Sequence, residues 1–232
     1  MIGSKKTGIY IVLEGVDLAG KSTIAENLVN KLKSETSGIE IYHAREPGHT
    51  GYGKEMRDVL HSKPILDVED EVKAAQLMLL DRLENTTTIS GKLREGAIVV
   101  LERNFLTALA YNEAGDTEEV QFIQKCNKAS LKPDVLYFID INQNTVENRL
   151  KERAKEFKLD AYENLNLIMR RRANYLNFSN YIDVIYVNNN DKDKYDIVNS
   201  IFKQIKLKLG EWNENYKKCI DFGIKQYPRC KQ

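Results

Sequence analysis

Cysteine is scarce in this sequence of 232 residues, where only Cys126, Cys219 and Cys230 occur. Their number is odd and no two stand in Cys-x-x-Cys spacing, so the sequence gives no support to a disulfide framework or a zinc site. Free thiols in a reducing compartment are the simpler interpretation.

Long apolar runs are also missing. No run approaches the ~20 residues that a membrane-spanning helix needs. The first apolar stretch is interrupted by Glu14 and Asp17, which argues against a signal peptide. We therefore expect a cytoplasmic protein without a membrane partner. The formal net charge of +1 gives no electrostatic reason to expect a nucleic-acid partner.

Five short apolar runs, largely of β-branched residues, are present instead. They are typical of buried strands and occupy residues 8–13, 39–43, 97–101, 135–139 and 184–187. Other segments have the apolar spacing of helices, among them residues 21–34, 67–93 and 195–209. Strands separated by helices predict an α/β fold, with a five-stranded parallel sheet covered by helices on both faces.

The segment 15–23 (GVDLAGKST) matches the pattern GxxxxGK[ST] between the first predicted strand and the first predicted helix. Gly15 and Gly20 let the backbone curl so that amide hydrogens point at phosphate oxygens. The helix dipole favours negative charge at the same point. Lys21 would reach the β- and γ-phosphates, and the Ser22 hydroxyl would complete a Mg²⁺ shell. We predict ATP binding by Gly15, Ala19, Gly20, Lys21, Ser22 and Thr23.

A phosphate-binding loop of this kind (P-loop), here residues 15–23, is shared by kinases, switch GTPases and motor ATPases. A GTPase should carry an Asn-Lys-x-Asp motif after a later strand. The nearest string, residues 127–130 (NKAS), lacks the aspartate and precedes the fourth predicted strand. The sequence therefore disfavours a GTPase.

The remaining motifs follow in a fixed order along the chain. They are residues 44–50 (AREPGHT), Arg57, residues 79–82 (LLDR), residues 101–104 (LERN), residues 107–112 (TALAYN) and residues 132–140 (KPDVLYFID). In this order, from about residue 11 to 187, the chain resembles the thymidylate kinases, a family of P-loop nucleoside monophosphate kinases. The resemblance implies a three-layer fold in residues 1–210, with a short lid near residues 150–162. Residues 211–232 would form a C-terminal extension of unknown role.

The resemblance also implies an activity. The chain would transfer the γ-phosphate of ATP to dTMP with Mg²⁺ as cofactor, giving dTDP and ADP. Its partners would be ATP, a pyrimidine deoxynucleotide and a second copy in a homodimer.

Carried over by position, the resemblance assigns roles to single residues. Asp17 would face the acceptor sugar and its phosphate, and Glu46 would lie near the metal and the acceptor. Arg57 and Arg103 would grip the acceptor phosphate, a task that suits a forked guanidinium. Glu102 would take the place of the family's usual aspartate and, with Ser22, hold Mg²⁺ through water. The implied catalytic residues are Lys21, Asp17, Arg103, Arg153 and Glu46.

The base, the sugar and the lid receive residues in the same way. Arg82 would hydrogen-bond the pyrimidine edge, and Tyr111 would pack where a 2′-hydroxyl would otherwise sit. Arg149, on the ATP side, and Arg153 would form a basic lid. The implied acceptor-binding residues are Asp17, Glu46, Arg57, Met78, Arg82, Arg103, Thr107, Tyr111 and Asn112. The run 170–172 (RRR) is interpreted as a solvated helix face, of which one member could guard the donor or the acceptor.

Several positions depart from the family pattern. Met78 stands where an aromatic ring usually stacks on thymine, Asn112 replaces a glutamine, and Ala161 replaces a lid arginine. Two alternatives therefore stay open. One is a kinase of a related acceptor: dUMP, a 5-modified pyrimidine deoxynucleotide, a deoxynucleoside or a modified base in DNA. The other is a non-catalytic P-loop regulator that binds nucleotide.

Overall fold

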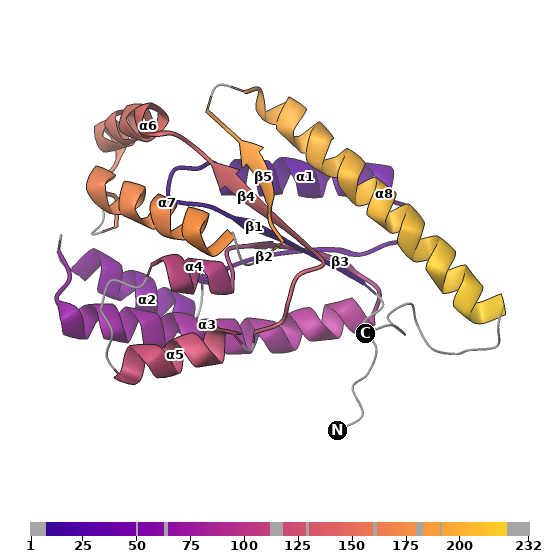
Figure 1. Cartoon of the computed structure of the whole chain (residues 1–232), viewed down its shortest axis with the longest axis horizontal. Helices are drawn as coiled ribbons and strands as arrows, with labels where there is room; N and C mark the ends of the chain where they lie inside the picture. Colours follow the sequence, from indigo (N-terminus) through magenta and orange to yellow (C-terminus); the bar gives the residue numbers. More distant parts are fainter. Residues whose placement is uncertain are drawn as a thin grey trace.

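The five predicted strands form one parallel sheet, drawn in Figure 1. The computed structural model describes residues 8–49, 51–62, 65–111, 118–128, 130–159, 162–179, 183–190 and 192–221. The strands are β1 (Ile9–Glu14), β2 (Ile41–Arg45), β3 (Ile98–Glu102), β4 (Val135–Asp140) and β5 (Ile185–Asn188). Their order in the sheet is β2-β3-β1-β4-β5, and every neighbouring pair is parallel. The predicted sheet is confirmed, although each strand ends one or two residues later than predicted.

Helices cover both faces of the sheet. They are α1 (Lys21–Glu35), α2 (Gly51–Ser62), α3 (Val68–Arg94), α4 (Phe105–Ala110), α5 (Glu118–Lys128), α6 (Gln143–Glu156), α7 (Leu165–Ser179) and α8 (Lys194–Asp221). Helices α1 and α8 lie together on one face, and α3, α4, α5 and α7 lie on the other (Figure 1). The last helix continues past residue 209, where the sequence pattern ends. The predicted division at residue 210 stays a prediction.

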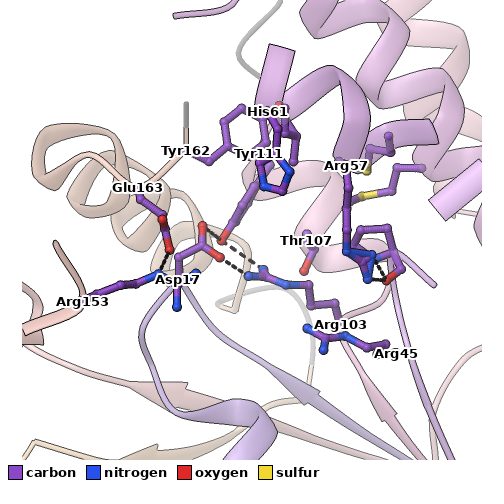
Figure 2. Close-up of a pocket in the computed structure, with 14 residues that line it drawn as sticks. Asp17, Arg45, Arg57, His61, Arg103, Thr107, Tyr111, Arg153, Tyr162 and Glu163 are labelled. Atoms are coloured by element: carbon purple, nitrogen blue, oxygen red, sulfur yellow. Dashed lines mark hydrogen bonds and ion pairs between the residues drawn. The ribbon is translucent and has the colours of Figure 1, made fainter. Parts of the chain in front are cut away.

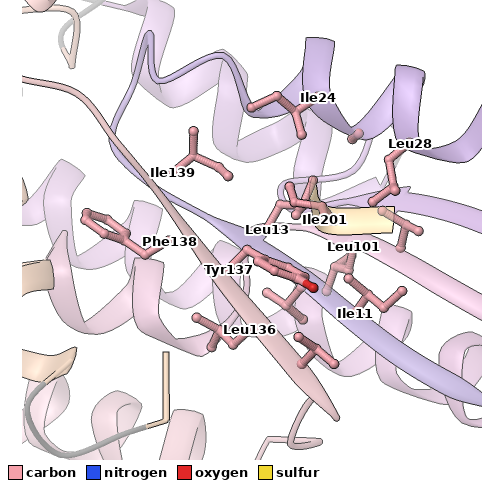
Figure 3. Packing of buried hydrophobic residues seen from close by; sticks show 14 of the residues in the cluster. Ile11, Leu13, Ile24, Leu28, Leu101, Leu136, Tyr137, Phe138, Ile139 and Ile201 are labelled. Atoms are coloured by element: carbon pink, nitrogen blue, oxygen red, sulfur yellow. The ribbon is translucent and has the colours of Figure 1, made fainter. Parts of the chain in front are cut away.

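The core fills the space between the sheet and these helices. Ile11 and Leu13 of β1 are fully buried, as is Tyr137 of β4. Ile24 of α1 and Ile201 of α8 pack onto this side of the sheet (Figure 3). Each aliphatic side chain of this kind contributes roughly 1.5–3 kcal/mol by its burial. This packing explains why the central strands read as uninterrupted apolar runs.

The topology also predicts where a ligand would bind. The chain continues from β1 to β2, beyond β3 on one side, whereas β4 on the other side of β1 continues to β5, so the direction of the connections reverses beside β1. In open α/β sheets, ligands bind outside the carboxyl ends of the strands at such a point. The loop after β1 and the residues after β3 lie there.

Among the described residues, no helix is both long and apolar enough to cross a membrane.

Candidate functional site

The loop between β1 and α1 has the backbone that its glycines predict. Gly15 has φ 149° and Gly20 has φ 84°, both in the region that favours glycine. A Cβ atom at Gly15 would also lie 2.5 Å from the carbonyl oxygen of Ile139. Gly20 is the N-cap of α1 and provides no side-chain cap, so the first amides of α1 remain available to an anion.

Lys21 folds back along this loop. Its side chain is buried, and its Nζ donates to the carbonyl oxygens of Gly15 at 2.9 Å and Val16 at 2.7 Å. Burial, and next the charge of Arg103, lower the pKa of Lys21 to about 7. An incoming phosphate would favour the charged form of this ammonium group.

Two further side chains bind carbonyl groups of the loop. Arg149 of α6 donates to the carbonyl of Leu18 at 2.7 Å and to that of Asn189 at 2.9 Å. Asn189 follows β5 and donates to the carbonyl of Ala19 at 2.7 Å. Arg149 therefore contacts the loop of residues 15–23, and its predicted role in ATP binding stays a prediction. Asn189 was not singled out from the sequence, because nothing local indicates which loop lies beside the P-loop.

The predicted metal residues lie together. The Ser22 hydroxyl donates to Oε2 of Glu102 at 2.5 Å, and Nε2 of His43 on β2 lies 3.0 Å from Oε1. Burial would raise the pKa of Glu102, but the contacts of His43 and Ser22 outweigh it and lower this pKa. The carboxylate is therefore ionised. Its contact with His43 depends on the pairing of β2 with β3. The sequence alone does not predict this contact.

Asp17 and Arg103 form the centre of the acceptor side (Figure 2). Arg103 Nη2 forms an ion pair with Oδ1 of Asp17, and Nη1 donates to the hydroxyl of Tyr111 at 3.0 Å. That hydroxyl in turn donates to Oδ2 of Asp17 at 2.9 Å. Burial alone would raise the pKa of Asp17, but Arg103, Lys21 and Arg171 hold it below its ordinary value. Arg103 has φ 67°, a strained conformation for a residue with a side chain.

A cavity of about 290 Å³ opens beside this group. Most of the predicted acceptor and catalytic residues line it (Figure 2). Those in its wall are Asp17, Arg57, Met78, Arg103, Thr107, Tyr111 and Arg153. The wall also holds residues that are not among the predicted site residues, and Arg45, His61 and Tyr162 are three of them. The cavity is thus rich in guanidinium groups, as a site for an anionic ligand requires.

Two wall residues are fixed by their partners. The guanidinium of Arg57 on α2 donates to the carbonyl oxygen of Pro47 at 2.6 Å and to that of Gly48 at 2.7 Å. The hydroxyl of Thr107 on α4 lies 2.6 Å from Oε2 of Glu14, which is buried at the end of β1. Contacts within the protein therefore set the positions of these side chains.

Glu46 and Arg82 lie outside the cavity wall. Arg82 of α3 is buried, and its Nε donates to Oε2 of Glu46 at 2.7 Å. Its Nη1 donates to Oδ1 of Asn127 on α5. The side chain of Glu46 therefore contacts Arg82. Its backbone amide donates to the carbonyl oxygen of Glu102, at the end of β3, at 2.9 Å.

The lid region is described in part. Arg153 of α6 forms an ion pair with Glu163, and both line the cavity. The predicted site residue Asn112 and the departure at Ala161 lie outside the described residues. Within the described ranges, no group of three or more His, Cys, Asp or Glu residues has the arrangement of a metal site. A metal here would need phosphate and water ligands besides Ser22 and Glu102.

The interpretation of residues 170–172 as a solvated face is wrong for Arg171, which is fully buried. The sequence holds a signal that could have revealed this. Ile168, Arg171 and Tyr175 are spaced i, i+3 and i+7, the spacing of one helix face, and all three are buried. Arg170 next to it is exposed, so the three arginines of the run have different surroundings.

Comparisons with known proteins agree with this geometry. Residues 13–201 match the family model of thymidylate kinase. A protein of Thermococcus kodakarensis named "Probable thymidylate kinase" is 29% identical, over 88% of this chain and 100% of the relative. The thymidylate kinase of an Exiguobacterium species is 30% identical over 67% of this chain and 74% of its own. The structure of thymidylate kinase from Candida albicans superposes with a TM-score of 0.69 at 20% identity, covering 88% of this chain and 93% of that one.

Proposed function

This chain belongs to the thymidylate kinase family, and from that premise we propose that it transfers the γ-phosphate of ATP to dTMP, releasing ADP and dTDP. One observation carries the proposal: the P-loop and an arginine-lined cavity share Asp17, so that the donor and acceptor sites adjoin. Phosphoryl transfer needs alignment and charge neutralisation rather than a nucleophilic side chain. The comparisons favour neither the other acceptors nor a non-catalytic role.

The donor side binds the triphosphate. The amides of residues 15–23 and the amino end of α1 would surround the β- and γ-phosphates. Lys21 would exchange its two carbonyl contacts for phosphate oxygens, and Arg149 would act from beside the loop. Phosphates would raise the pKa of Lys21 from about 7, because they stabilise its charged form.

The acceptor side orients dTMP. Arg57 and Arg103 would bind its phosphate, with Asp17 and Tyr111 facing the sugar. The base would lie toward Met78 in the cavity wall. Arg82 lies behind this wall, and its Nη2 is buried without a hydrogen bond to any part of the chain that the structure describes. That nitrogen would donate to the pyrimidine edge only if side chains of the wall move aside when the acceptor binds, and Glu46 fixes the guanidinium from the other side.

Magnesium is the proposed cofactor. A hydroxyl and an ionised carboxylate, those of Ser22 and Glu102, meet at 2.5 Å beside the P-loop, and such oxygen ligands suit this hard cation. When bound, Mg²⁺ supplies positive charge to the β- and γ-phosphate oxygens. Ser22 would bind it directly and Glu102 through water. Arg153, at the rim of the cavity, would add positive charge to the transferring group.

We also propose a homodimer. Leu80 and Leu83 of α3 are 39% and 54% exposed, and Phe122 of α5, a helix in contact with α3, is 65% exposed. Large apolar side chains at neighbouring exposed positions support an interface on this face. The cytoplasmic location stays a prediction from the sequence.

The proposal is tested with the purified full chain, Mg-ATP and dTMP, by following ADP release. We expect ADP and dTDP in equal amounts, and no turnover when EDTA removes the metal. The matched control is Lys21→Met, which removes the ammonium group and keeps the length of the side chain. Absence of ADP release with dTMP, by a wild-type protein that binds ATP, would rule out this function.

A further inference from the structure

Arg171 lies directly behind the acceptor cavity. It belongs to α7, its exposed fraction is 0%, and it is not a wall residue. Asp17, Tyr111 and Tyr162, which do line the wall, all contact it. A buried charge in this position acts on a ligand through the residues in front of it.

Its contacts are those of a planar cation between polar and aromatic partners. The guanidinium carbon lies 4.0 Å from the ring centroid of Tyr111 and 3.7 Å from that of Tyr162. Its Nη1 lies 3.6 Å from Oδ2 of Asp17. Cations over aromatic faces are attracted most strongly where water is excluded, as it is here.

The three contacted residues come from separate parts of the chain. Asp17 belongs to the P-loop, Tyr111 is the C-cap of α4, and Tyr162 precedes α7. The two tyrosine rings meet edge to face, 6.0 Å apart, and stand together in Figure 2. Tyr162 is also bound from α3, because its hydroxyl donates to Glu71 at 2.7 Å. Arg171 contacts Asp17, Tyr111 and Tyr162 and thereby connects these three parts of the chain.

We propose that Arg171 is a positioning residue that fixes the sugar-facing wall of the cavity and thereby sets the preference for a deoxyribose. The proposal rests on the proposed function, in which Tyr111 packs where a 2′-hydroxyl would sit. The hydroxyl of Tyr111 is held by Arg103 and Asp17. Its ring lies 4.0 Å from the guanidinium carbon of Arg171, and that of Arg103 is farther away at 5.1 Å. With the ring free to tilt, a ribose would fit more easily.

The planar shape of arginine matters as much as its charge. A guanidinium presents flat faces to rings, whereas an ammonium group is a compact and strongly hydrated point charge. Lysine at this position would keep the charge toward Asp17 but would lose the flat, stacked contact with both rings. The two properties can therefore be separated by substitution.

The test compares dTMP with its ribonucleotide counterpart, ribothymidine 5′-monophosphate. The measured quantity is the ratio of the two kcat/KM values, which does not depend on the fraction of folded enzyme. We expect Arg171→Met to lower the ratio about tenfold, the change that corresponds to roughly 1.4 kcal/mol of lost discrimination. Arg171→Lys should lower it by a similar factor. Where turnover of the ribonucleotide is too slow, calorimetry gives the ratio of the two dissociation constants, which measures the discrimination in binding.

The matched control is Arg170→Met, the same change at the exposed neighbour on α7, which should keep the wild-type ratio. An unchanged ratio in Arg171→Met, or a ratio fully restored in Arg171→Lys, would overturn the proposal. A wild-type protein that does not turn over dTMP would instead refute the proposed function. If Arg171→Met does not fold, the lysine variant decides the question alone.

Discussion

Replacing Asp17 with asparagine should lower the stability of the protein without nucleotide. The carboxylate faces the guanidinium of Arg103, that of Arg171 at 3.6 Å and the hydroxyl of Tyr111 at 2.9 Å. Asparagine keeps an oxygen for the hydroxyl but removes the negative charge between the buried guanidinium of Arg171 and the partly buried guanidinium of Arg103. The loss of a partner from a buried charge pair is strongly destabilising.

The size of the effect follows from the contacts and their exposure. The side chain of Asp17 is 21% exposed and that of Arg103 is 13% exposed, so solvent screens the pair only in part. A hydrogen bond to a charged group contributes about 1.5–3 kcal/mol, and we expect a loss of about 2–3 kcal/mol for Asp17→Asn. For a chain of this size the Tm should fall by roughly 4–12 °C.

The assay is thermal unfolding, followed by far-UV circular dichroism, with and without dTMP. The acceptor phosphate would supply the missing negative charge, so dTMP should raise the Tm of the variant more than that of the wild type. The matched control is Asp58→Asn, the same change in the Lys54–Asp58 pair, whose side chains are 64% and 62% exposed. Exposed pairs contribute little, and we expect no measurable change there.

The pH dependence gives a second check with a definite sign. The pKa of Asp17 is lowered in the folded protein, so its contribution is complete above the unfolded-state pKa of about 3.9. It is lost as the pH falls through the lower, folded-state pKa. The difference in Tm between wild type and Asp17→Asn should therefore narrow below about pH 4. If Asp17→Asn melts at the same temperature as Asp58→Asn at neutral pH, the reasoning is refuted.

Three further predictions concern the donor, the metal and the base. ATP binding above pH 7 should take up a proton, because the pKa of Lys21 is lowered to about 7 without nucleotide and phosphates raise it. The affinity should fall by up to about tenfold per pH unit in this range, and calorimetry at pH 8 in two buffers that shows no proton uptake would contradict this. Glu102→Gln should raise the Mg²⁺ concentration for half-maximal activity by about 10–100-fold. A metal titration superimposable on the wild type would count against Glu102 as a ligand through water. Met78→Phe should lower the KM for dTMP by about 5–10-fold, since a stacked base contributes about 1–3 kcal/mol. An unchanged or higher KM would exclude Met78 as a wall of the base site.

Much of the fold could be predicted because its signals are local. Strands buried on both faces must be apolar throughout, and β1, β3 and β4 were recognised for that reason. The P-loop depends on glycine at two backbone positions that other residues rarely adopt, so its spacing alone identified it. The boundaries were less accurate, because each strand continues onto a polar residue, such as Glu102, that apolar runs do not include.

The parts that could not be predicted depend on which elements are neighbours. His43 contacts Glu102 because β2 pairs with β3, a pairing that neither strand encodes alone. Arg171 is buried because α7 packs on α4 with one particular face inward. A run of three arginines by itself suggests a solvated surface, and its spacing from Ile168 and Tyr175 is the sequence feature that marks Arg171 as part of the buried face. The rotation of the helix about its axis places Arg171 inward and its neighbour Arg170 outward.

The side chains that hydrogen-bond to the carbonyl groups of the P-loop have a consequence for the rate of nucleotide binding. Arg149 and Asn189 bind the carbonyls of Leu18 and Ala19. These contacts within the protein hold the loop in one shape, so little conformational entropy is lost when a triphosphate binds. Association should then be limited by diffusion and electrostatic attraction rather than by a folding step of the loop, so its rate should decrease with added salt.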